Sequence, residues 1–496
     1  MIFVALSVFA VTGCVHRAEC KLHGGPEWHV LTSPHFEMRT DAELDDARGA
    51  LERMEQLRGV LFDFCGGQAE APSKLTILYF RDRDEIDDLR STDRAYMNSY
   101  ARRMVLGPDF FTTAGWRVGS VLVHELTHDV AHHALLRMPR WLNEGLAQYL
   151  ATAHLEKNGT QVAVGMQDSS ALYGVTMHNR FPVSELWDFS GPLWKEEDAE
   201  REGTFYSSSW LLVHFLVNRH YTELATWFDH LRRAEDPRSS FEAIFGKDSQ
   251  KLEKELDDYL SDGHYSAFHY DVNLSPVPIT VKELPPSLVH LARFELGWDA
   301  VESDLPRSPE KVADDATKAI QLGHDVFEAR EFQFQLTLGR DARLQSARTL
   351  AAEFPNEAQA HFLLAKQLKT QGPTRDEALR ELRKVLELNP RHASALNAIA
   401  WDMVTHGEGA KAVGMAQTAV EVEPWNANIV DTLASAMAAA GRCSDASATE
   451  HRALELLGHD ASRTNQDFAK RAELFSRPDC ASHVPQAETT VAAQGN

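Results

Sequence analysis

The sequence lacks two features that would assign it to a large class of proteins. After its first residues it has no apolar run of the roughly 18 residues that span a bilayer. Its 73 aspartates and glutamates outnumber its 50 lysines and arginines, and no basic stripe offsets the net charge of -23. These absences argue against a later membrane span and against nucleic acid or anionic lipid as a direct partner. What is present, 496 residues of which 43% are hydrophobic, suffices for two to four domains with buried cores.

The N-terminus carries a short apolar run followed by a cysteine. Residues 2–11 are apolar but too few to span a bilayer, as in the core of a secretory signal peptide. Val11-Thr-Gly-Cys14 resembles a bacterial lipobox, although no lysine or arginine precedes the run. The resemblance implies that residues 1–13 are removed and that Cys14 carries a lipid anchor. The protein is then expected in the bacterial cell envelope, at the periplasmic face of the outer membrane. A buried strand is the alternative for this segment.

Cysteines are few, and their number is even once Cys14 is set aside. The remaining four are Cys20, Cys65, Cys443 and Cys480. In an oxidising compartment an even count permits two disulfides. Proximity in the sequence favours pairing the first two with each other and the last two with each other.

One helical pattern carries two histidines and a glutamate at the spacing of a zinc site. His124, Glu125 and His128 form a His-Glu-x-x-His motif, preceded by three apolar residues from Val121 to Val123. On a helix the two histidines lie one turn apart on the same face and can hold one Zn²⁺. Glu125 then lies beside the open coordination position, where a general base is needed.

A zinc ion needs a third protein ligand, and the sequence offers two candidates. Glu144 follows His128 after a short interval, in a second helical pattern that starts near Pro139. A short turn between the two helices can return Glu144 to the first one. His132 lies on the same face as His128, but three histidines along one helix span about 12 Å, too far to share an ion. We predict Glu144 as the ligand, with His132 and His133 as solvated or hydrogen-bonded bystanders.

Two segments of the sequence resemble the gluzincin clan of zinc metallopeptidases, especially the peptidase MA-like family. They are His-Glu-Leu-Thr-His and the later Trp141-Leu-Asn-Glu-Gly-Leu-Ala-Gln-Tyr149. The resemblance covers roughly residues 28–260. It implies three zinc ligands and one general base: His124, His128, Glu144 and Glu125.

The same resemblance implies a catalytic tyrosine in a later helix, and Tyr206, at the start of a helical pattern well after Glu144, holds that place. Its phenol is expected to donate to the developing oxyanion, and an ordinary interface tyrosine is the alternative. His178 and His214 are weaker donor candidates, and His214 lies in an apolar helix face that favours simple packing. The sequence departs from thermolysin-like enzymes at Gln148, where they have an aspartate that orients a ligand histidine. It also lacks the Gly-x-Met-Glu-Asn motif with which gluzincin aminopeptidases recognise a free amino terminus.

Other patterns outline the fold around the motif. Trp28–Phe36 and Leu75–Phe80 have the composition of strands, and residues 41–61 form an amphipathic helix pattern. Arg102–Leu106 is a predicted strand, which the resemblance makes an edge strand able to pair with extended substrate. Phe205–Leu216 predicts a helix with one apolar face.

The chain changes character after a stretch with four prolines, and helical repeats are predicted beyond it. Pro390, Pro424 and Gly458 are evenly spaced along the chain. Pairs of small or apolar residues recur with the same period: Ala378 and Val385, Ala412 and Ala419, Ala446 and Ala453. This period resembles that of tetratricopeptide repeats, and an ordinary helical bundle is the alternative. We expect a linker, degenerate helical repeats, tetratricopeptide repeats and a disordered tail, at residues 271–286, 287–354, 355–478 and 479–496.

The predicted fold class is α+β. A gluzincin-type metallopeptidase domain, with a small mixed sheet and a helical lobe, occupies residues 14–270, and an all-α tetratricopeptide-repeat solenoid follows. The leading interpretation is a zinc-dependent endopeptidase of the envelope, whose repeats recruit a protein substrate or partner through their groove. The alternative is a non-catalytic or chaperone-like scaffold lipoprotein with a vestigial metallopeptidase domain. The intact Glu125 argues against that alternative, because a relic needs no base.

Overall fold

The protein is described from a computed structural model, in which the chain forms two compact units. The first unit comprises Met1–Glu52, Leu75–Gly115 and Val277–Ala329, and the second comprises Arg53–Lys74, Trp116–Pro276 and Arg330–Asn496. The structure describes residues 20–67, 71, 73–82, 86, 95–98, 102–107, 116–156, 160–177, 180–189, 199–247, 249–271, 275–298, 309–368, 372–457 and 463–487.

The first unit is built on a six-stranded mixed sheet with the order β4-β5-β3-β2-β1-β9. Its strands are β1 (His29–Thr32), β2 (Phe36–Thr40), β3 (Leu75–Tyr79), β4 (Ala95–Asn98), β5 (Arg103–Leu106) and β9 (Thr280–Glu283). The β2–β3 and β3–β5 pairs are parallel, and the other pairs are antiparallel. Alternate side chains of β2 are buried, at Phe36, Met38 and Thr40, so one face of this strand lies in the core.

The strand predictions were right in type but not in every position. Leu75–Phe80 forms β3 as predicted. Trp28–Phe36 contains β1 and the first residue of β2, because a turn at Pro34 separates them and the Ser33 N–H donates to the Phe36 carbonyl at 3.0 Å. The prediction that Arg102–Leu106 is an edge strand is wrong. β5 pairs with β3 on one side and with β4 on the other, so β4 and β9 are the edges.

The stretch predicted as a linker, residues 271–286, contains a strand of the sheet. β9 pairs antiparallel with β1, and Leu31 lies opposite Val281. Prolines flank this strand and do not interrupt it, which is where a sheet tolerates them. Helix α11 (Pro286–Trp298) follows and packs on α12 (Pro309–Leu322), so part of the predicted repeat region 287–354 belongs to the sheet-containing unit.

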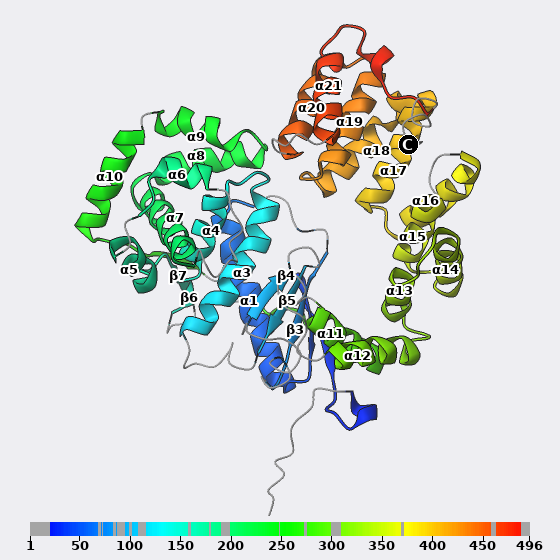
Figure 1. Ribbon diagram of the computed structural model, residues 1–496, viewed down its shortest axis with the longest axis horizontal. Coiled ribbons are helices and arrows are strands. Elements are labelled where there is room, and N and C mark those ends of the chain that lie inside the picture. Colours follow the sequence, from blue (N-terminus) through cyan, green and yellow to red (C-terminus); the bar gives the residue numbers. More distant parts are fainter. Residues whose placement is uncertain are drawn as a thin grey trace, which may run out of the picture. The chain divides into compact units, whose positions relative to one another are not determined.

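The second unit begins with helices that carry the motif residues. Its main elements before residue 277 are α3 (Trp116–Ala134), α4 (Arg140–Leu150), β6 (His154–Leu155), β7 (Gln161–Val164), α5 (Ser169–Met177), α6 (Val183–Asp188), α7 (Ala199–Arg219), α8 (Tyr221–Arg232), α9 (Pro237–Phe245), α10 (Ser249–Asp262) and β8 (Phe268–Asp271). Figure 1 shows α3 and α4 in cyan and α7 in green, and α4 packs against both. Helix α1 (Leu44–Phe64), predicted for residues 41–61, runs from the first unit into the second.

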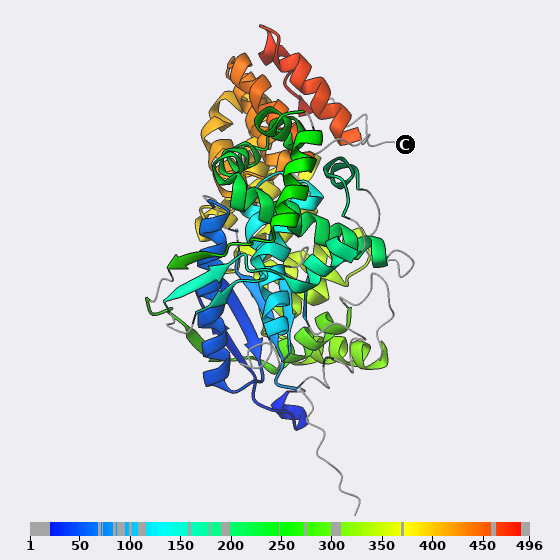
Figure 2. The same ribbon diagram turned by 90° about the vertical axis from the view of Figure 1, so that its left-hand side faces the viewer.

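The helices after residue 329 recur with the period seen in the sequence. They are α14 (Arg340–Glu353), α15 (Ala358–Leu368), α16 (Arg375–Leu388), α17 (Ala393–Met403), α18 (Gly409–Val422), α19 (Ala427–Ala439), α20 (Cys443–Leu457) and α21 (Arg463–Phe475), with α13 (Phe327–Gln335) before them. Helices α16, α18 and α20 begin at equal intervals along the chain, and consecutive helices pack side by side, as the orange and red ones do in Figure 2. The six residues that recur at this period are all fully buried. Their identity as tetratricopeptide repeats remains a prediction.

One predicted disulfide is confirmed and the other is wrong. Cys443 is bonded to Cys480, whereas Cys20 and Cys65 are free and buried. The disulfide also orders the start of the predicted disordered tail, since a short 3-10 helix, Cys480–His483, is followed by the buried Val484. Residues 1–19, with the predicted signal peptide and Cys14, lie outside the described residues. Among the helices described, none has an apolar stretch long enough to cross a membrane.

Candidate metal centre

Helix α3 holds both histidines of the motif on one face. Leu122, Leu126 and Val130 recur at helical spacing and are buried, which fixes the rotation of the helix about its axis. The rings of His124 and His128 meet edge to face with their centroids 4.7 Å apart. Their Nε2 atoms are 3.1 Å apart, so both imidazoles direct a nitrogen to one point.

Helix α4 brings Glu144 to that point. The Glu144 Oε2 atom lies 3.6 Å from the His124 Nε2 atom and 3.5 Å from the His128 Nε2 atom. The turn between α3 and α4 ends at Pro139, which caps α4 in extended conformation and needs no intrahelical amide bond there. The structure therefore brings the three predicted ligands together.

The geometry of these three residues fits a zinc ion. In a tetrahedral zinc site with bonds of about 2.0–2.1 Å, neighbouring ligand atoms are about 3.4 Å apart. The observed separations of 3.1, 3.5 and 3.6 Å bracket that value. Two imidazoles and a carboxylate are donors that zinc accepts, and three protein ligands leave a fourth position for a reactant.

The electrostatics of the centre favour an ionised glutamate. Burial by itself would raise the pKa of Glu144, but hydrogen bonds from His124 and His128 outweigh it and hold this pKa at about 2. Burial acts to lower the pKa of His128, but the hydrogen bond and the negative charge of Glu144 outweigh burial. The pKa of His128 is therefore raised. Glu144 is thus a carboxylate at neutral pH, which is the form that binds a metal.

A neighbour of Glu144 orients one of the histidines. The Oδ1 atom of Asn143 lies 3.1 Å from the Nδ1 atom of His128, so the amide oxygen accepts the proton of that nitrogen and turns Nε2 toward Glu144 and His124. Gln148, at the position where the family resemblance expects the partner of a ligand histidine, instead lines a cavity beside α7.

A glycine allows α4 to lie close to α7. A Cβ atom added at Gly145 would lie 2.5 Å from the Ser209 carbonyl oxygen and 2.8 Å from the Val213 Cγ2 atom. Because these contacts are closer than van der Waals distance, the two helices can cross here only with glycine. Gly145 follows Glu144 directly, so this crossing also fixes the position of the ligand.

Tyr206 lies on α7 about one turn before the crossing. It lines a cavity of about 380 Å³, together with Gln148, Asp168, Ser170, Ala171, Tyr173, Gly174, Glu200, Gly203, Thr204 and Ser207. Burial raises the pKa of Tyr206 and the negative charges of Glu144 and Glu125 raise it further, so the phenol stays protonated and can donate. The structure therefore places Tyr206 in the wall of a cavity that α4 also lines, through Gln148.

Glu125 lies beside His124 on α3 and is half-buried. Its negative charge contributes to the upward shift of the pKa of His128 and of Tyr206. It does not belong to the cluster of ligand atoms formed by the two histidines and Glu144. This arrangement suits a base that acts next to a metal.

The remaining histidines of this region lie away from the centre. His132 is exposed, and the ring of His133 donates to the Asp129 carbonyl at 2.7 Å, in accord with their prediction as bystanders. His214 is buried between the Tyr259 hydroxyl at 2.7 Å and the Gly165 carbonyl at 3.0 Å. Burial lowers the pKa of His214 to about 4, so it is a neutral packing residue. His178 lies outside the described residues.

Comparison with known proteins adds one match. Residues 119–236 are similar to a family described as Protein of unknown function (DUF1570). This segment contains both histidines, Glu125, Glu144 and Tyr206. No curated protein matches the chain.

Proposed function

We propose that this protein is a zinc-dependent peptidase, and that it acts as an endopeptidase on protein or peptide substrates. The observation that carries the proposal is the convergence of the His124, His128 and Glu144 ligand atoms within 4.8 Å of one another. Two further features support it: a carboxylate outside the ligand set, at Glu125, and a protonated phenol on the neighbouring helix, at Tyr206.

His124, His128 and Glu144 would hold the zinc ion. A zinc ion there would supply Lewis acidity, which polarises a carbonyl and lowers the pKa of water toward neutral pH. Glu125 takes a proton from the attacking water and passes it to the leaving amine. Tyr206 donates its phenolic hydrogen to the substrate oxygen as negative charge builds on it.

The wider setting is proposed from the sequence patterns. The helices from α15 to α21 would recruit a protein substrate or partner, and a lipid on Cys14 would tether the chain to the bacterial envelope. These assignments extend the proposed activity and are not needed for it. A non-catalytic scaffold remains the competing function, because helical repeats by themselves bind proteins.

Metal content and cleavage of unfolded casein, measured on the same samples, test the proposal. His128→Ala should lose one zinc ion per chain and all cleavage, because two remaining ligands hold zinc poorly. His132→Ala is the matched control on the same helix, and it should keep both. Removal of metal with a chelator should abolish cleavage, and added zinc should restore it. Casein cleavage that persists without metal would contradict the proposal, and zinc binding without any cleavage by wild type would favour the scaffold.

A further inference from the structure

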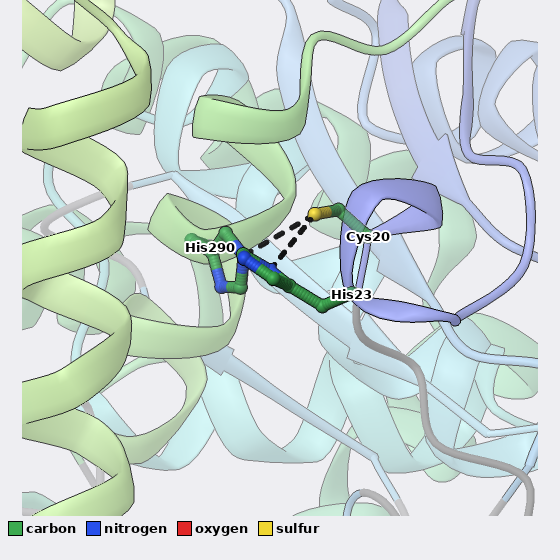
Figure 3. A group of neighbouring side chains, drawn as sticks. All are labelled: Cys20, His23 and His290. Carbon is green, nitrogen blue, oxygen red and sulfur yellow. Dashed lines mark hydrogen bonds between the residues drawn. The ribbon is translucent and has the colours of Figure 1, made fainter.

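A second group of metal-ligating side chains lies in the first unit. Cys20, His23 and His290 direct one atom each toward a common point (Figure 3). The Cys20 Sγ atom lies 3.3 Å from the His290 Nε2 atom and 3.3 Å from the His23 Nδ1 atom. The two ring nitrogens are 3.0 Å apart. Cys20 is the N-cap of the short 3-10 helix Lys21–His23, His23 is its last residue, and His290 comes from α11.

The buried histidine of this group is oriented from behind. His290 is fully buried, and its Nδ1 atom lies 2.6 Å from the Asp315 Oδ1 atom on α12. Arg293 donates to both oxygens of Asp315 at 3.1 Å and holds the carboxylate in place. The His290 Nδ1 proton therefore points to Asp315, and the lone pair of Nε2 points into the group. A carboxylate behind an imidazole is the usual support of a metal-ligating histidine.

We propose that Cys20, His23 and His290 form a second zinc site, separate from the one on α3 and α4. Thiolate sulfur and imidazole nitrogen bind zinc at about 2.3 and 2.0–2.1 Å, which sets tetrahedral edges of about 3.4–3.6 Å. The observed separations between these ligand atoms, 3.0 and 3.3 Å, are slightly shorter. Small side-chain movements would lengthen them to the tetrahedral values. Cys20 and His290 are buried and His23 is exposed, so solvent can supply the fourth ligand from the His23 side.

A catalytic cysteine would use part of the same arrangement, since Cys20, His290 and Asp315 are connected in the order of a thiol, a base and an orienting carboxylate. Two observations favour the metal. Cys20 is only 1% exposed, so a substrate carbonyl cannot reach its sulfur. The second imidazole, His23, has no role in such a triad, yet its nitrogen faces the same point.

A metal ion at this site would connect two segments of one unit that are far apart in the sequence. Cys20 and His23 precede β1, His290 follows β9, and these two strands are neighbours in the sheet. The ligands are 267 and 270 positions apart in the sequence, so an ion held there closes a very long loop. We assign this site a stabilising role, which does not depend on peptidase activity and lies outside residues 119–236.

Zinc analysis of the purified full-length protein tests the site. Wild type should hold two zinc ions per chain, and His23→Ala should hold one. Because His23 is exposed, its replacement should leave the fold intact. His124→Ala should also hold one, and the double variant none. Cys65→Ala, at the other free cysteine among the described residues, is the control and should keep two, because burial raises the pKa of Cys65 to about 12 and opposes the thiolate form.

Cobalt replacement identifies the ligand type. Wild type loaded with Co²⁺ should show thiolate-to-cobalt charge-transfer absorption in the near ultraviolet, because only this site offers a cysteine. The absorption should vanish in Cys20→Ser and persist in His124→Ala, whose remaining cobalt sits at the second site. Absence of the absorption in wild type, or full zinc content in His23→Ala, would overturn the proposal.

Discussion

Asn143 and Glu144 are neighbours in the sequence but serve the candidate zinc centre in different ways. Glu144 supplies an oxygen to the group of ligand atoms, and Asn143 holds the ring of His128 from the side away from it. Asn143 should therefore affect how tightly zinc is bound through His128, whereas Glu144 should decide whether zinc binds at all.

Asn143→Ala should weaken zinc binding by about 10- to 100-fold, the usual effect of removing the partner of a ligating histidine. Affinity can be measured by competition with a chromophoric chelator, on the Cys20→Ser background so that one site is followed. Gln148→Ala is the control, and its affinity should equal that of the parent. Equal affinities in both variants would show that the hydrogen bond to His128 is unimportant.

Tyr206→Phe should lower kcat about a hundredfold or more while leaving zinc content and melting temperature unchanged. A phenol that donates to the developing oxyanion acts mainly in the transition state, so KM should change far less. Tyr173→Phe, in the wall of the same cavity, is the matched control. A near-wild-type kcat for Tyr206→Phe would remove this residue from the mechanism.

The candidate ligands of the first site could be predicted from the sequence, because a turn of helix fixes the distance from His124 to His128. The sequence does not show whether Asn143 or Gln148 holds the ring of His128. That choice depends on how α4 is rotated about its axis, which is set by its packing on α7 and not by the motif.

At the scale of elements, the crossing of α4 and α7 connects packing to the centre. Gly145→Ala should destabilise the protein by about 1–3 kcal/mol, because the added methyl group meets backbone at Ser209. It should also weaken zinc binding, since relief of the contact moves Glu144. Thermal unfolding and chelator competition measure the two effects.

Gly414 is a suitable control for that substitution. It lies within α18, where an added Cβ meets nothing within 4 Å. Gly414→Ala should therefore stabilise the protein by about 0.5–1 kcal/mol through the lower entropy of the unfolded chain. A Gly145→Ala variant as stable as wild type would mean that α4 and α7 can separate freely.

Elements with a strong local pattern could be predicted, and elements defined by a distant partner could not. The regular period of the later helices and the apolar composition of β3 are local properties of the sequence. β9 has only four residues and lies among prolines, and its partner β1 is far away in the sequence. β5 was expected at the edge from the family resemblance, and nothing in its own sequence reveals β4 on its far side.

For the whole molecule, the position of β9 sets where the chain can be shortened. A protein ending at Tyr270 loses β9 and α11, together with the buried Leu284, Val289 and Leu296, so its first unit should not fold. A protein ending at Gly339 keeps all parts of that unit and should retain both zinc ions and the cleavage of small peptides.

The two truncated proteins are compared by zinc content and by the cooperativity of thermal unfolding. Cooperative unfolding of the first unit in the shorter protein would contradict the assignment of β9 to the sheet. If the protein ending at Gly339 lost the zinc ion held between α3 and α4, the later helices would be needed to fold the second unit. Residues from 330 onward belong to that unit.

The group formed by Cys20, His23 and His290 was not predicted, for the same reason as β9. Cys20 was paired with Cys65 because they are near in the sequence, whereas the chain returns to Cys20 only after 270 positions. A pattern of ligands spread over such a distance has no local signal, so only the folded chain reveals it.

The most direct test of the proposed function compares casein cleavage by wild type and Glu125→Gln at equal zinc content. Glu125 lies outside the ligand set, so the variant should bind the same amount of zinc. Loss of the general base should lower the cleavage rate by about 10²- to 10⁴-fold. A Glu125→Gln variant that retains its zinc and cleaves casein at the wild-type rate would contradict the account.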